Sequence, residues 1–343
     1  MAYKGVMDDI RDCVALKTPK RAPVFAMSEE FDVRMAGMTY DQFNRDPAAM
    51  SKCLIDTIRA YGYDWAWLQV DDCIEFEVLG VGVKGGGNIL PATCAYLPAA
   101  YETLRSLKMP DPQKDGRMPV LLEAIKRVKD TLGDTICVTG RLAAPFSSVT
   151  LLYGMMDTLT LIYDDPDLIQ ETIKFFIDLQ IKFGLAQFAA GADALWVGDC
   201  NASGHLISED QYREFALDGV KQIVKAYDEV GGLSFYHASE HYMGHLIASA
   251  ETGVSAVSVG PGMDLAAAKK AVGGRMCLMG NVDPVNVLLF ADAQTVYDES
   301  RRVFETGAAG GGYIFNSGEM IPRDTPEENI RAFIKAGRGE KFI

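Results

Sequence analysis

Two of the four histidines in this 343-residue chain lie in one short segment, Phe235-Tyr236-His237-Ala238-Ser239-Glu240-His241. The segment ends a mostly apolar run, residues 231–235, that is typical of a buried strand. A histidine at the carboxyl end of such a strand can serve as a general acid or base, or as a metal ligand. A third interpretation gives His237 only a hydrogen bond at the rim of the fold.

Several side chains at other strand ends are candidate partners for His237 in a zinc site. They are Glu319, Glu240, Asp199 and Cys200. Zinc accepts nitrogen, oxygen and sulfur ligands of these kinds. The ligands would come from separate strands, so their spacing in the sequence does not test the site. The sequence favours His237 and Glu319 as metal ligands, with Glu240 as a third.

The remaining histidines are expected to be structural. His241 and His245 have the spacing of neighbours on one helix face. We expect that face to be solvated or packed, because His237, which begins the same spacing, should end a strand. His205 is expected in a loop. Walker A, G-x-S-x-G and H-E-x-x-H motifs do not occur in the sequence.

The segments that position these residues alternate between two kinds. Eight short apolar runs read as strands buried on both faces: 23–27, 64–70, 136–141, 193–198, 232–237, 254–259, 276–281 and 312–315. Helical patterns lie between them at 46–61, 118–132, 166–190, 208–230, 240–250, 265–272, 293–306 and 326–336. This alternation predicts an α/β fold, a (β/α)₈ TIM barrel spanning 1–343 as one domain after an N-terminal helical extension.

In such a barrel the carboxyl ends of the strands meet at one pocket. The pocket would be rich in carboxylates and aromatic rings. The catalytic candidates are His237, Glu319, Asp72 and Asp199. The substrate-binding candidates are Met27, Trp196, Tyr236, Arg141 and Asn281.

Residues 72–107 interrupt the simple repeat. Gly80, Gly82 and Gly85 match the spacing of a dinucleotide-binding loop. A helix should follow such a loop, but Pro91 and Pro98 follow here. We therefore expect an inserted loop or hairpin that could act as a lid, with a plain surface loop as the alternative.

The composition favours a soluble cytoplasmic enzyme. Lys plus Arg is 33 and Asp plus Glu is 47, a formal net charge of -14, which argues against a nucleic-acid partner. No apolar run approaches the roughly 18 residues of a membrane span, and the N-terminus lacks the apolar core of a signal peptide. The seven scattered cysteines, without a C-x-x-C pair, are expected to be reduced thiols.

Four segments together resemble the uroporphyrinogen decarboxylase superfamily: Asp46-Pro-Ala-Ala with the helix to Tyr63-Asp64, Leu206-Ile-Ser-Glu-Asp-Gln-Tyr-Arg-Glu-Phe215, Met279-Gly-Asn-Val-Asp-Pro284 and Thr325-Pro-Glu-Glu-Asn-Ile330. The resemblance covers most of the chain and implies a (β/α)₈ barrel. Members of the superfamily divide between porphyrinogen decarboxylases and corrinoid-dependent methyltransferases.

The decarboxylase branch differs from this chain at its substrate-holding residues. That branch has Met-Arg-Gln-Ala-Gly-Arg near the first strand, with two arginines for the substrate carboxylates. Here the region reads Met27-Ser-Glu-Glu-Phe-Asp-Val-Arg34. The late Asn-Leu-Gly-His of that branch is Asn316-Ser-Gly-Glu319 here, although Asp71 or Asp72 stands where the branch has its pyrrole-binding aspartate.

The branch that methylates coenzyme M carries zinc on a His-x-Cys motif and a late Cys. His237-Ala238-Ser239 keeps the histidine alone, and the late Cys falls at or next to Glu319. A histidine with carboxylates would make a harder, more Lewis-acidic site, suited to an oxygen or nitrogen leaving group. In this respect the chain looks like the methyltransferase components of corrinoid-dependent O-demethylases, which act on methoxylated aromatics.

The resemblance implies a methyltransferase that moves a methyl group from a small donor, a methoxylated aromatic, to cobalamin. The sequence has no D-x-H-x-x-G motif, so a separate corrinoid protein is expected to carry the cobalamin. Zinc, or direct protonation by His237, would assist the leaving oxygen. Open alternatives are a decarboxylase, a methylcobalamin:thiol methyltransferase and a non-catalytic ligand-binding barrel. A homodimer is one open possibility for the assembly.

Overall fold

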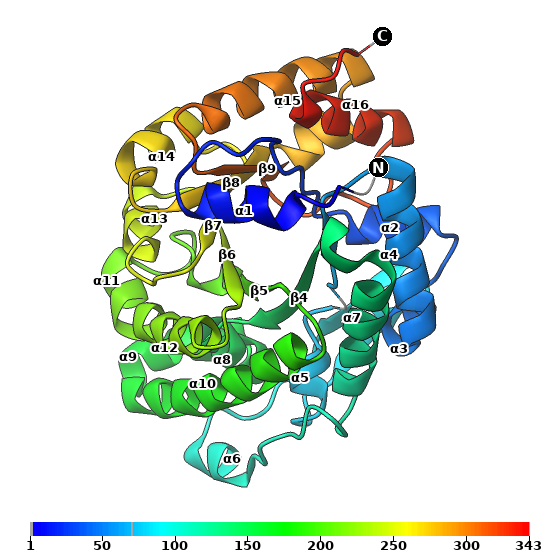
Figure 1. Cartoon of the computed structure of the whole chain (residues 1–343). Helices are drawn as coiled ribbons and strands as arrows, with labels where there is room; N and C mark the ends of the chain where they lie inside the picture. The colour runs from blue at the N-terminus through cyan, green and yellow to red at the C-terminus, as the bar shows by residue number, and fades with distance from the viewer. Residues whose placement is uncertain (1–2, 70, 343) are drawn as a thin grey trace.

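The computed structural model describes residues 3–69 and 71–342 (Figure 1). In that part of the chain, parallel strands form one curled sheet in the order β1-β4-β5-β6-β7-β8-β9. Their bounds are Trp65–Trp67, Cys137–Ala143, Ala194–Gly198, Leu233–Glu240, Ala256–Val259, Cys277–Val282 and Tyr313–Ser317. Each strand pairs with the next parallel strand in the chain, as a (β/α)₈ barrel requires.

Residues 23–27 close the barrel between β9 and β1. Val24 forms a parallel bridge with Phe315, and its carbonyl accepts a 2.9 Å hydrogen bond from the amide of Asp64. The predicted (β/α)₈ architecture is therefore confirmed, with the first predicted strand reduced to a bridge. The second was predicted to reach Val70, which lies outside the described residues; among those described, it ends at Trp67.

The major helices of the outer layer agree closely with the predicted ranges. They are α4 Pro47–Tyr61, α7 Met118–Leu132, α10 Pro166–Ala189, α14 Leu265–Val272, α15 Ala293–Ala308 and α16 Glu327–Arg338 (Figure 1). Helix α4 shows why the ends of a helix could be predicted from the sequence. Asp46 caps the Ala48 amide at 2.8 Å, Pro47 takes the first turn, and Gly62 ends the helix with a positive φ of 84°.

Two predicted helices begin or run differently. The range 208–230 is divided into α11 Glu209–Gln211, a π-helical turn η3 Tyr212–Ala216, and α12 Leu217–Asp228. The range 240–250 shrinks to α13 Met243–Ser249, because β6 continues to Glu240. His241 therefore precedes the helix, and the expected helix face shared by His241 and His245 is wrong.

Shorter helices complete the described chain. They are α1 Val6–Val14, α2 Glu29–Met35, α3 Tyr40–Arg45, α5 Ile74–Glu77, α6 Tyr101–Ser106, α8 Pro145–Tyr153, α9 Met155–Asp164, the 3-10 turns η1 Gly133–Thr135 and η2 Cys200–Ala202, and the π-helical turn η4 Pro284–Leu289. No described helix combines the length and apolar character needed to cross a membrane.

An antiparallel hairpin, β2 Val83–Gly86 and β3 Ile89–Thr93, lies within the stretch where an insertion was expected. Its tip is fastened on two sides. The Gly87 amide donates to Asp41 Oδ2 at 2.7 Å, and Arg323 Nη2 donates to Asn88 Oδ1 at 3.0 Å. Glu319 and Arg323 share one loop after β9, so the hairpin is tied to that loop.

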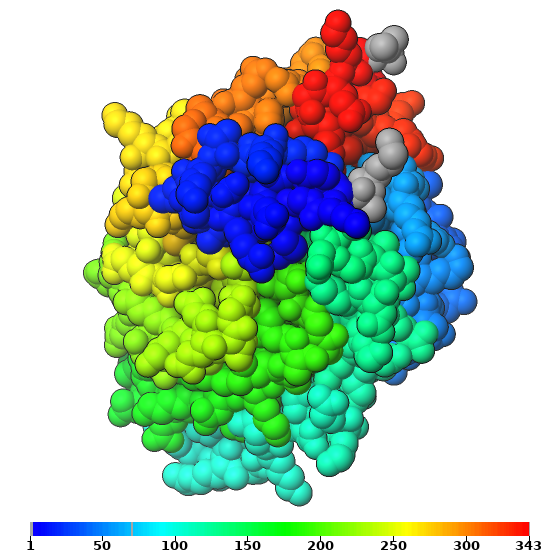
Figure 2. Space-filling view, in the orientation of Figure 1, coloured from blue at the N-terminus to red at the C-terminus, as the bar shows by residue number. Residues whose placement is uncertain are grey.

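Helix α1 and the segment after it cover the amino-terminal end of the barrel. Figure 2 shows this N-terminal segment lying across the middle of the molecule. Where this segment leads into the barrel, the buried carboxylate of Asp64 accepts hydrogen bonds from Arg21 at 2.5 Å, from the Val24 amide at 2.9 Å and from Arg338 of α16. One carboxylate thus ties the first barrel segment to the C-terminal helix.

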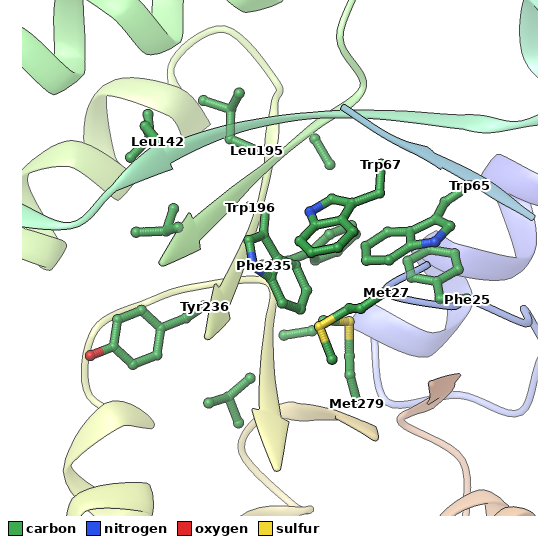
Figure 3. Close-up of a cluster of buried hydrophobic side chains, with 14 of the residues drawn as sticks. Phe25, Met27, Trp65, Trp67, Leu142, Leu195, Trp196, Phe235, Tyr236 and Met279 are labelled. Carbon is green, nitrogen blue, oxygen red and sulfur yellow. The ribbon is translucent and has the colours of Figure 1, made fainter. Parts of the chain in front are cut away.

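Aromatic rings fill the barrel interior (Figure 3). Phe25 stacks on Trp65 with ring centroids 4.3 Å apart, and Trp65 stacks on Trp67 at 5.7 Å. Trp196 meets both tryptophans nearly edge-on, at 5.5 and 5.7 Å. Each large buried ring contributes roughly 1.5–3 kcal/mol relative to exposure, so this packing supports the positions of the residues above it.

Candidate functional site

His237 lies in a bulge of β6 at the carboxyl end of the barrel. Tyr236 pairs with Val257, whereas the next paired residue, Glu240, lies opposite Val259. The residues between them are therefore displaced around Ser258, and Ser239 adopts a positive φ of 48°. Bulges of this kind re-aim side chains near active sites.

The His237 imidazole is held on both sides. Its Nδ1 lies 2.9 Å from Ser258 Oγ, and its Nε2 lies 3.2 Å from each carboxylate oxygen of Glu319. The residue is 4% exposed. Ser258 thus fixes the ring so that Nε2 faces the carboxylate.

The His237–Glu319 contact is an ion pair. Burial alone would lower the pKa of His237, but Glu319 and Cys200 raise it well above its usual value. Burial alone would raise the pKa of Glu319, but the charge of His237 and the hydroxyl of Ser239 help to lower it to about 2. His237 is therefore protonated at neutral pH in the metal-free protein.

Cys200 joins this pair to form a possible metal-binding cluster. One ligand atom each from Cys200, His237 and Glu319 lie within 4.8 Å of one another. The three residues come from the ends of three strands, β5, β6 and β9, so only the fold brings them together. Of the sequence candidates, His237, Glu319 and Cys200 meet.

Glu240 does not join this cluster. Its Oε1 accepts from the amides of His241 at 2.8 Å and Tyr242 at 2.6 Å, and its Oε2 accepts from the Gly204 amide at 3.2 Å. The carboxylate therefore ties the end of β6 to the loop after β5. The geometry favours Cys200 over Glu240 as the third ligand.

A cavity of about 190 Å³ adjoins the cluster. Its described lining consists of Trp67, Gln69, Asp72, Arg141, Ala143, Ser147, Leu151, Trp196, Gly198, Cys200, Asn201, His237, Glu319 and Met320. The Trp67 and Trp196 rings meet at 68°, and the Trp196 ring centroid lies 4.8 Å from that of His237. A flat, apolar group in this corner would therefore lie close to the imidazole.

Another part of the cavity lining is charged instead of apolar. It is built around Arg141, which is 2% exposed. Its Nη2 donates to Asp72 Oδ1 at 2.7 Å, and its Nη1 donates to the fully buried Glu75. Gln69 Nε2 donates to the same Asp72 oxygen at 3.1 Å. Asp72 and Arg141 were both predicted for the site, whereas Glu75 and Gln69 were not.

Side chains replace a missing strand along this wall. β1 pairs with β4 only as far as Thr139, because β1 ends at Trp67. Beyond that point the Gln187 amide of α10 exchanges two 2.9 Å hydrogen bonds with the backbone of Arg141, and Glu75 Oε1 accepts from the Ala143 amide at 2.9 Å. The backbone amides of Arg141 and Ala143 and the carbonyl of Arg141 thereby gain hydrogen-bond partners.

Four other sequence candidates lie away from the cavity lining. Asp199 accepts from Ser147 Oγ and Tyr236 Oη, each at 2.7 Å, and burial raises the pKa of Asp199 to about 6. Figure 3 shows Tyr236 directed away from Trp196. Asn281 donates to the carbonyls of Gly260 and Met263 at 3.0 and 2.9 Å. Met27 is fully buried and packs in the aromatic interior.

The residues that sequence reasoning missed had weak signals. Ser258 is one of two serines in the run 254–259, which contains the strand next to the one that carries His237. Glu75 and Gln69 flank Asp72, but they belong to an irregular segment whose folding back toward Arg141 no periodicity reveals. Asn201 directly follows Cys200, and it donates to Thr150 on α8.

Comparison with known proteins gives one matching family and relatives that cover most of this chain. The family described as Uroporphyrinogen decarboxylase (URO-D) matches residues 7–339. A uroporphyrinogen decarboxylase of Aromatoleum aromaticum is 26% identical over 313 residues, covering 88% of this chain and 85% of the relative. A methylcobamide:CoM methyltransferase of Methanosarcina acetivorans is 25% identical over 282 residues, covering 82% and 81%.

Among solved structures, a methyltransferase from Methanosarcina mazei superimposes with a TM-score of 0.87. It shares 21% sequence identity, and the match covers 97% of this chain and 98% of the other. At that identity the likeness concerns the fold, which extends over the whole barrel. The curated relatives on both sides of the family are named as enzymes.

Proposed function

This chain belongs to the uroporphyrinogen decarboxylase family, and we propose that it is a methyltransferase that moves a methyl group from a methoxylated aromatic compound to the cobalamin of a separate corrinoid protein. One observation carries this proposal: the cluster of Cys200, His237 and Glu319 adjoins a cavity walled by Trp67 and Trp196. The methyltransferase among the relatives supports the reaction class.

The size of the cavity argues against a tetrapyrrole substrate. An engineered cavity of about 150 Å³ accommodates benzene, so 190 Å³ suits one substituted aromatic ring. A porphyrinogen has four linked pyrrole rings and several carboxylates. Arg141 of the described lining is already paired with Asp72 and Glu75, so it does not offer a free cation for such a substrate.

The cluster has the donor set of a zinc site. Nitrogen from His237, oxygen from Glu319 and sulfur from Cys200 are all established zinc ligands, and three protein ligands leave a position for a substrate atom. These three residues would hold the ion. When bound, zinc would act as a Lewis acid that polarises the ether oxygen of the donor.

The protein's own groups perform the remaining tasks. Trp67 and Trp196 hold the ring and keep water from its faces. When the methyl group departs, the ether oxygen keeps the electron pair of the broken bond and becomes a phenolate. In the metal-free protein, protonated His237, oriented by Ser258, can supply the proton that neutralises this oxygen.

The test is methyl transfer with purified protein, cob(I)alamin and a panel of methoxyarenes, followed by the absorbance of cobalamin. We expect methylcobalamin and the demethylated phenol to appear in equal amounts. Transfer from a methylated thiol or amine, with none from any methoxyarene, would contradict the proposed donor. The absence of transfer from every donor would contradict the reaction itself.

A further inference from the structure

We propose that the methyl donor is an uncharged methoxyphenol, and that Asp72 recognises its hydroxyl group while excluding methoxybenzoates. This inference rests on the proposed function, because it names the class of donor for the same cavity. It follows from the charges and the hydrogen-bonding capacity of the wall formed by Gln69, Asp72 and Arg141.

The charge of this wall is negative. Arg141 contributes one positive charge, and it is shared between the carboxylates of Asp72 and Glu75. The His237–Glu319 pair adds no net charge. Zinc bound by one thiolate and one carboxylate would add none either. The described groups around the cavity therefore leave one unbalanced negative charge, and a second carboxylate brought in by a donor would meet repulsion.

The surroundings of the wall reinforce this charge. Behind it, Arg117 pairs with both Asp71 and Glu77, again one cation between two carboxylates. The nearby Glu29 is 1% exposed, and neither of its oxygens has a partner among the described residues. Burial raises the pKa of Glu29 well above its usual value, and the charges of Asp71, Glu30 and Asp72 raise it further. Glu29 is therefore favoured in its neutral form and adds no charge of its own, while the surrounding carboxylates supply the negative charge.

Asp72 offers a specific acceptor to a ligand. Its Oδ1 is occupied by Arg141 and Gln69, whereas its Oδ2 has no partner among residues 3–69 and 71–342. The side chain is 62% exposed, and the residue lines the cavity. An ionised carboxylate only accepts hydrogen bonds, so its natural partner is a hydroxyl donor. The bond would be charge-assisted and therefore stronger than a bond between neutral groups.

Arg141 does not offset this preference. A methoxybenzoate could pair with the guanidinium only by displacing Asp72, while Glu75 would remain attached to Nη1. The displaced carboxylate would stay beside the ligand, because Asp72 lies on the same short segment as Glu75, and Glu75 keeps that segment at Arg141. A neutral phenol needs no such displacement, because it adds a donor to an unfilled acceptor.

The experiment measures binding to the full-length protein through quenching of tryptophan fluorescence. Three matched ligand series are titrated: methoxyphenols, methoxybenzenes without a hydroxyl group, and methoxybenzoates. We expect methoxyphenols to bind about tenfold more tightly than methoxybenzenes, and methoxybenzoates to bind more weakly still, as the loss of a charge-assisted hydrogen bond predicts.

The variant Asp72→Asn provides the decisive comparison. It removes the negative charge while keeping a similar shape, so methoxyphenols should lose about tenfold in affinity and methoxybenzoates should gain. Asp157→Asn, at an exposed position on α9, is the matched control and should leave all three series unchanged. Equal or tighter binding of methoxybenzoates by the unchanged protein would overturn the inference, as would an unaltered order of ligands in Asp72→Asn.

Binding measured by fluorescence and methyl transfer measured by cobalamin absorbance together separate this inference from the proposed function. Methyl transfer from methoxybenzoates as fast as from methoxyphenols would keep the reaction and overturn the selectivity. Preferential binding of tetramethylammonium over every methoxyarene would overturn the selectivity as well, because it would make the wall a cation site. Methoxyphenol binding in the expected order, without any methyl transfer, would support the recognition role of Asp72 and contradict the reaction.

Discussion

Each end of the barrel carries a cluster of charged side chains, and the ratio of arginines to carboxylates is reversed between them. At the amino-terminal end, Asp64 is one carboxylate between two arginines, Arg21 and Arg338. At the carboxyl end, Arg141 is one arginine between two carboxylates, Asp72 and Glu75. The Asp64 side chain of the first cluster is only 3% exposed, whereas Asp72 and Arg141 of the second line a cavity.

The two clusters differ in whether every carboxylate oxygen has a hydrogen-bond partner within the protein. Both Asp64 oxygens accept hydrogen bonds from protein groups, so the closed end joins distant parts of the chain. At the open end, Asp72 Oδ2 has no partner among the described residues. Charges that satisfy one another stabilise the fold, and a charge left partly unsatisfied beside a cavity is available to a ligand.

The largest expected effect is on stability at the closed end. Asp64→Asn should lower the free energy of unfolding by about 3–5 kcal/mol, because it leaves two partly buried arginines without their counter-ion. Urea unfolding measures this change. The control Asp130→Asn breaks an exposed pair with Lys126 and should cost at most about 0.5 kcal/mol. Equal losses in the two variants would show that Asp64 does not hold the closed end.

At the open end, His237→Ala should reduce methyl transfer by about 10²–10⁴-fold with little loss of stability, since a positioned acid or ligand is removed. The rate of cobalamin methylation measures it. His241→Ala, at the same rim but outside the cluster, should keep nearly full activity. An active His237→Ala protein would remove this residue from the mechanism.

The third prediction concerns metal. If Cys200 completes the cluster, Cys200→Ser should weaken zinc binding by at least about 10–100-fold, which is the loss typical of changing a residue that only supports a ligand. Elemental analysis after equilibrium dialysis gives the zinc content and affinity. Cys94→Ser removes another exposed thiol, which is not part of the cluster, and should change neither. Unchanged zinc affinity in Cys200→Ser would exclude the thiol as a ligand, and Glu240→Gln would then be the next variant to examine.

The smallest effect is the pH dependence of the His237–Glu319 pair in metal-free protein. The pKa of Glu319 is lowered to about 2, so its contribution is fully present above about pH 4.5 and is lost as the pH falls toward 2. Because Glu319 is partly exposed, solvent screening limits this contribution to about 1 kcal/mol. Urea titrations of the natural protein and Glu319→Gln should therefore differ at pH 7, begin to approach one another below about pH 4.5 and converge only near pH 2; a constant difference would contradict the assignment.

The sequence predicted the barrel well because its signals are repeated. Eight apolar runs alternate with helices, and caps such as Asp46 and Gly62 mark helix ends locally. The predicted start of helix 240–250 was wrong because a bulge carries β6 onward to Glu240, so that the helix begins at Met243. A bulge depends on contacts with a neighbouring strand, and those contacts have no local signature.

Strand alternation explains which of the predicted site residues line the cavity and which do not. Trp196 and His237 face the cavity, so Tyr236, adjacent to His237, points the other way. Asp199 likewise lies between two lining residues, Gly198 and Cys200, and its side chain is directed to Ser147. A stricter use of the two-residue period would have separated Tyr236 from His237.

The shortness of β1 has a consequence for motion. Past Thr139, the edge of β4 is held by side-chain groups of Gln187 and Glu75 instead of a continuous ladder of backbone hydrogen bonds. Such a seam can open without unfolding the sheet, since only a few rotamers must change. Hydrogen exchange should therefore be faster at the Arg141 and Ala143 amides than at the paired amides of β5. The wall that faces the donor would then be the part of the barrel best able to adjust to a new one.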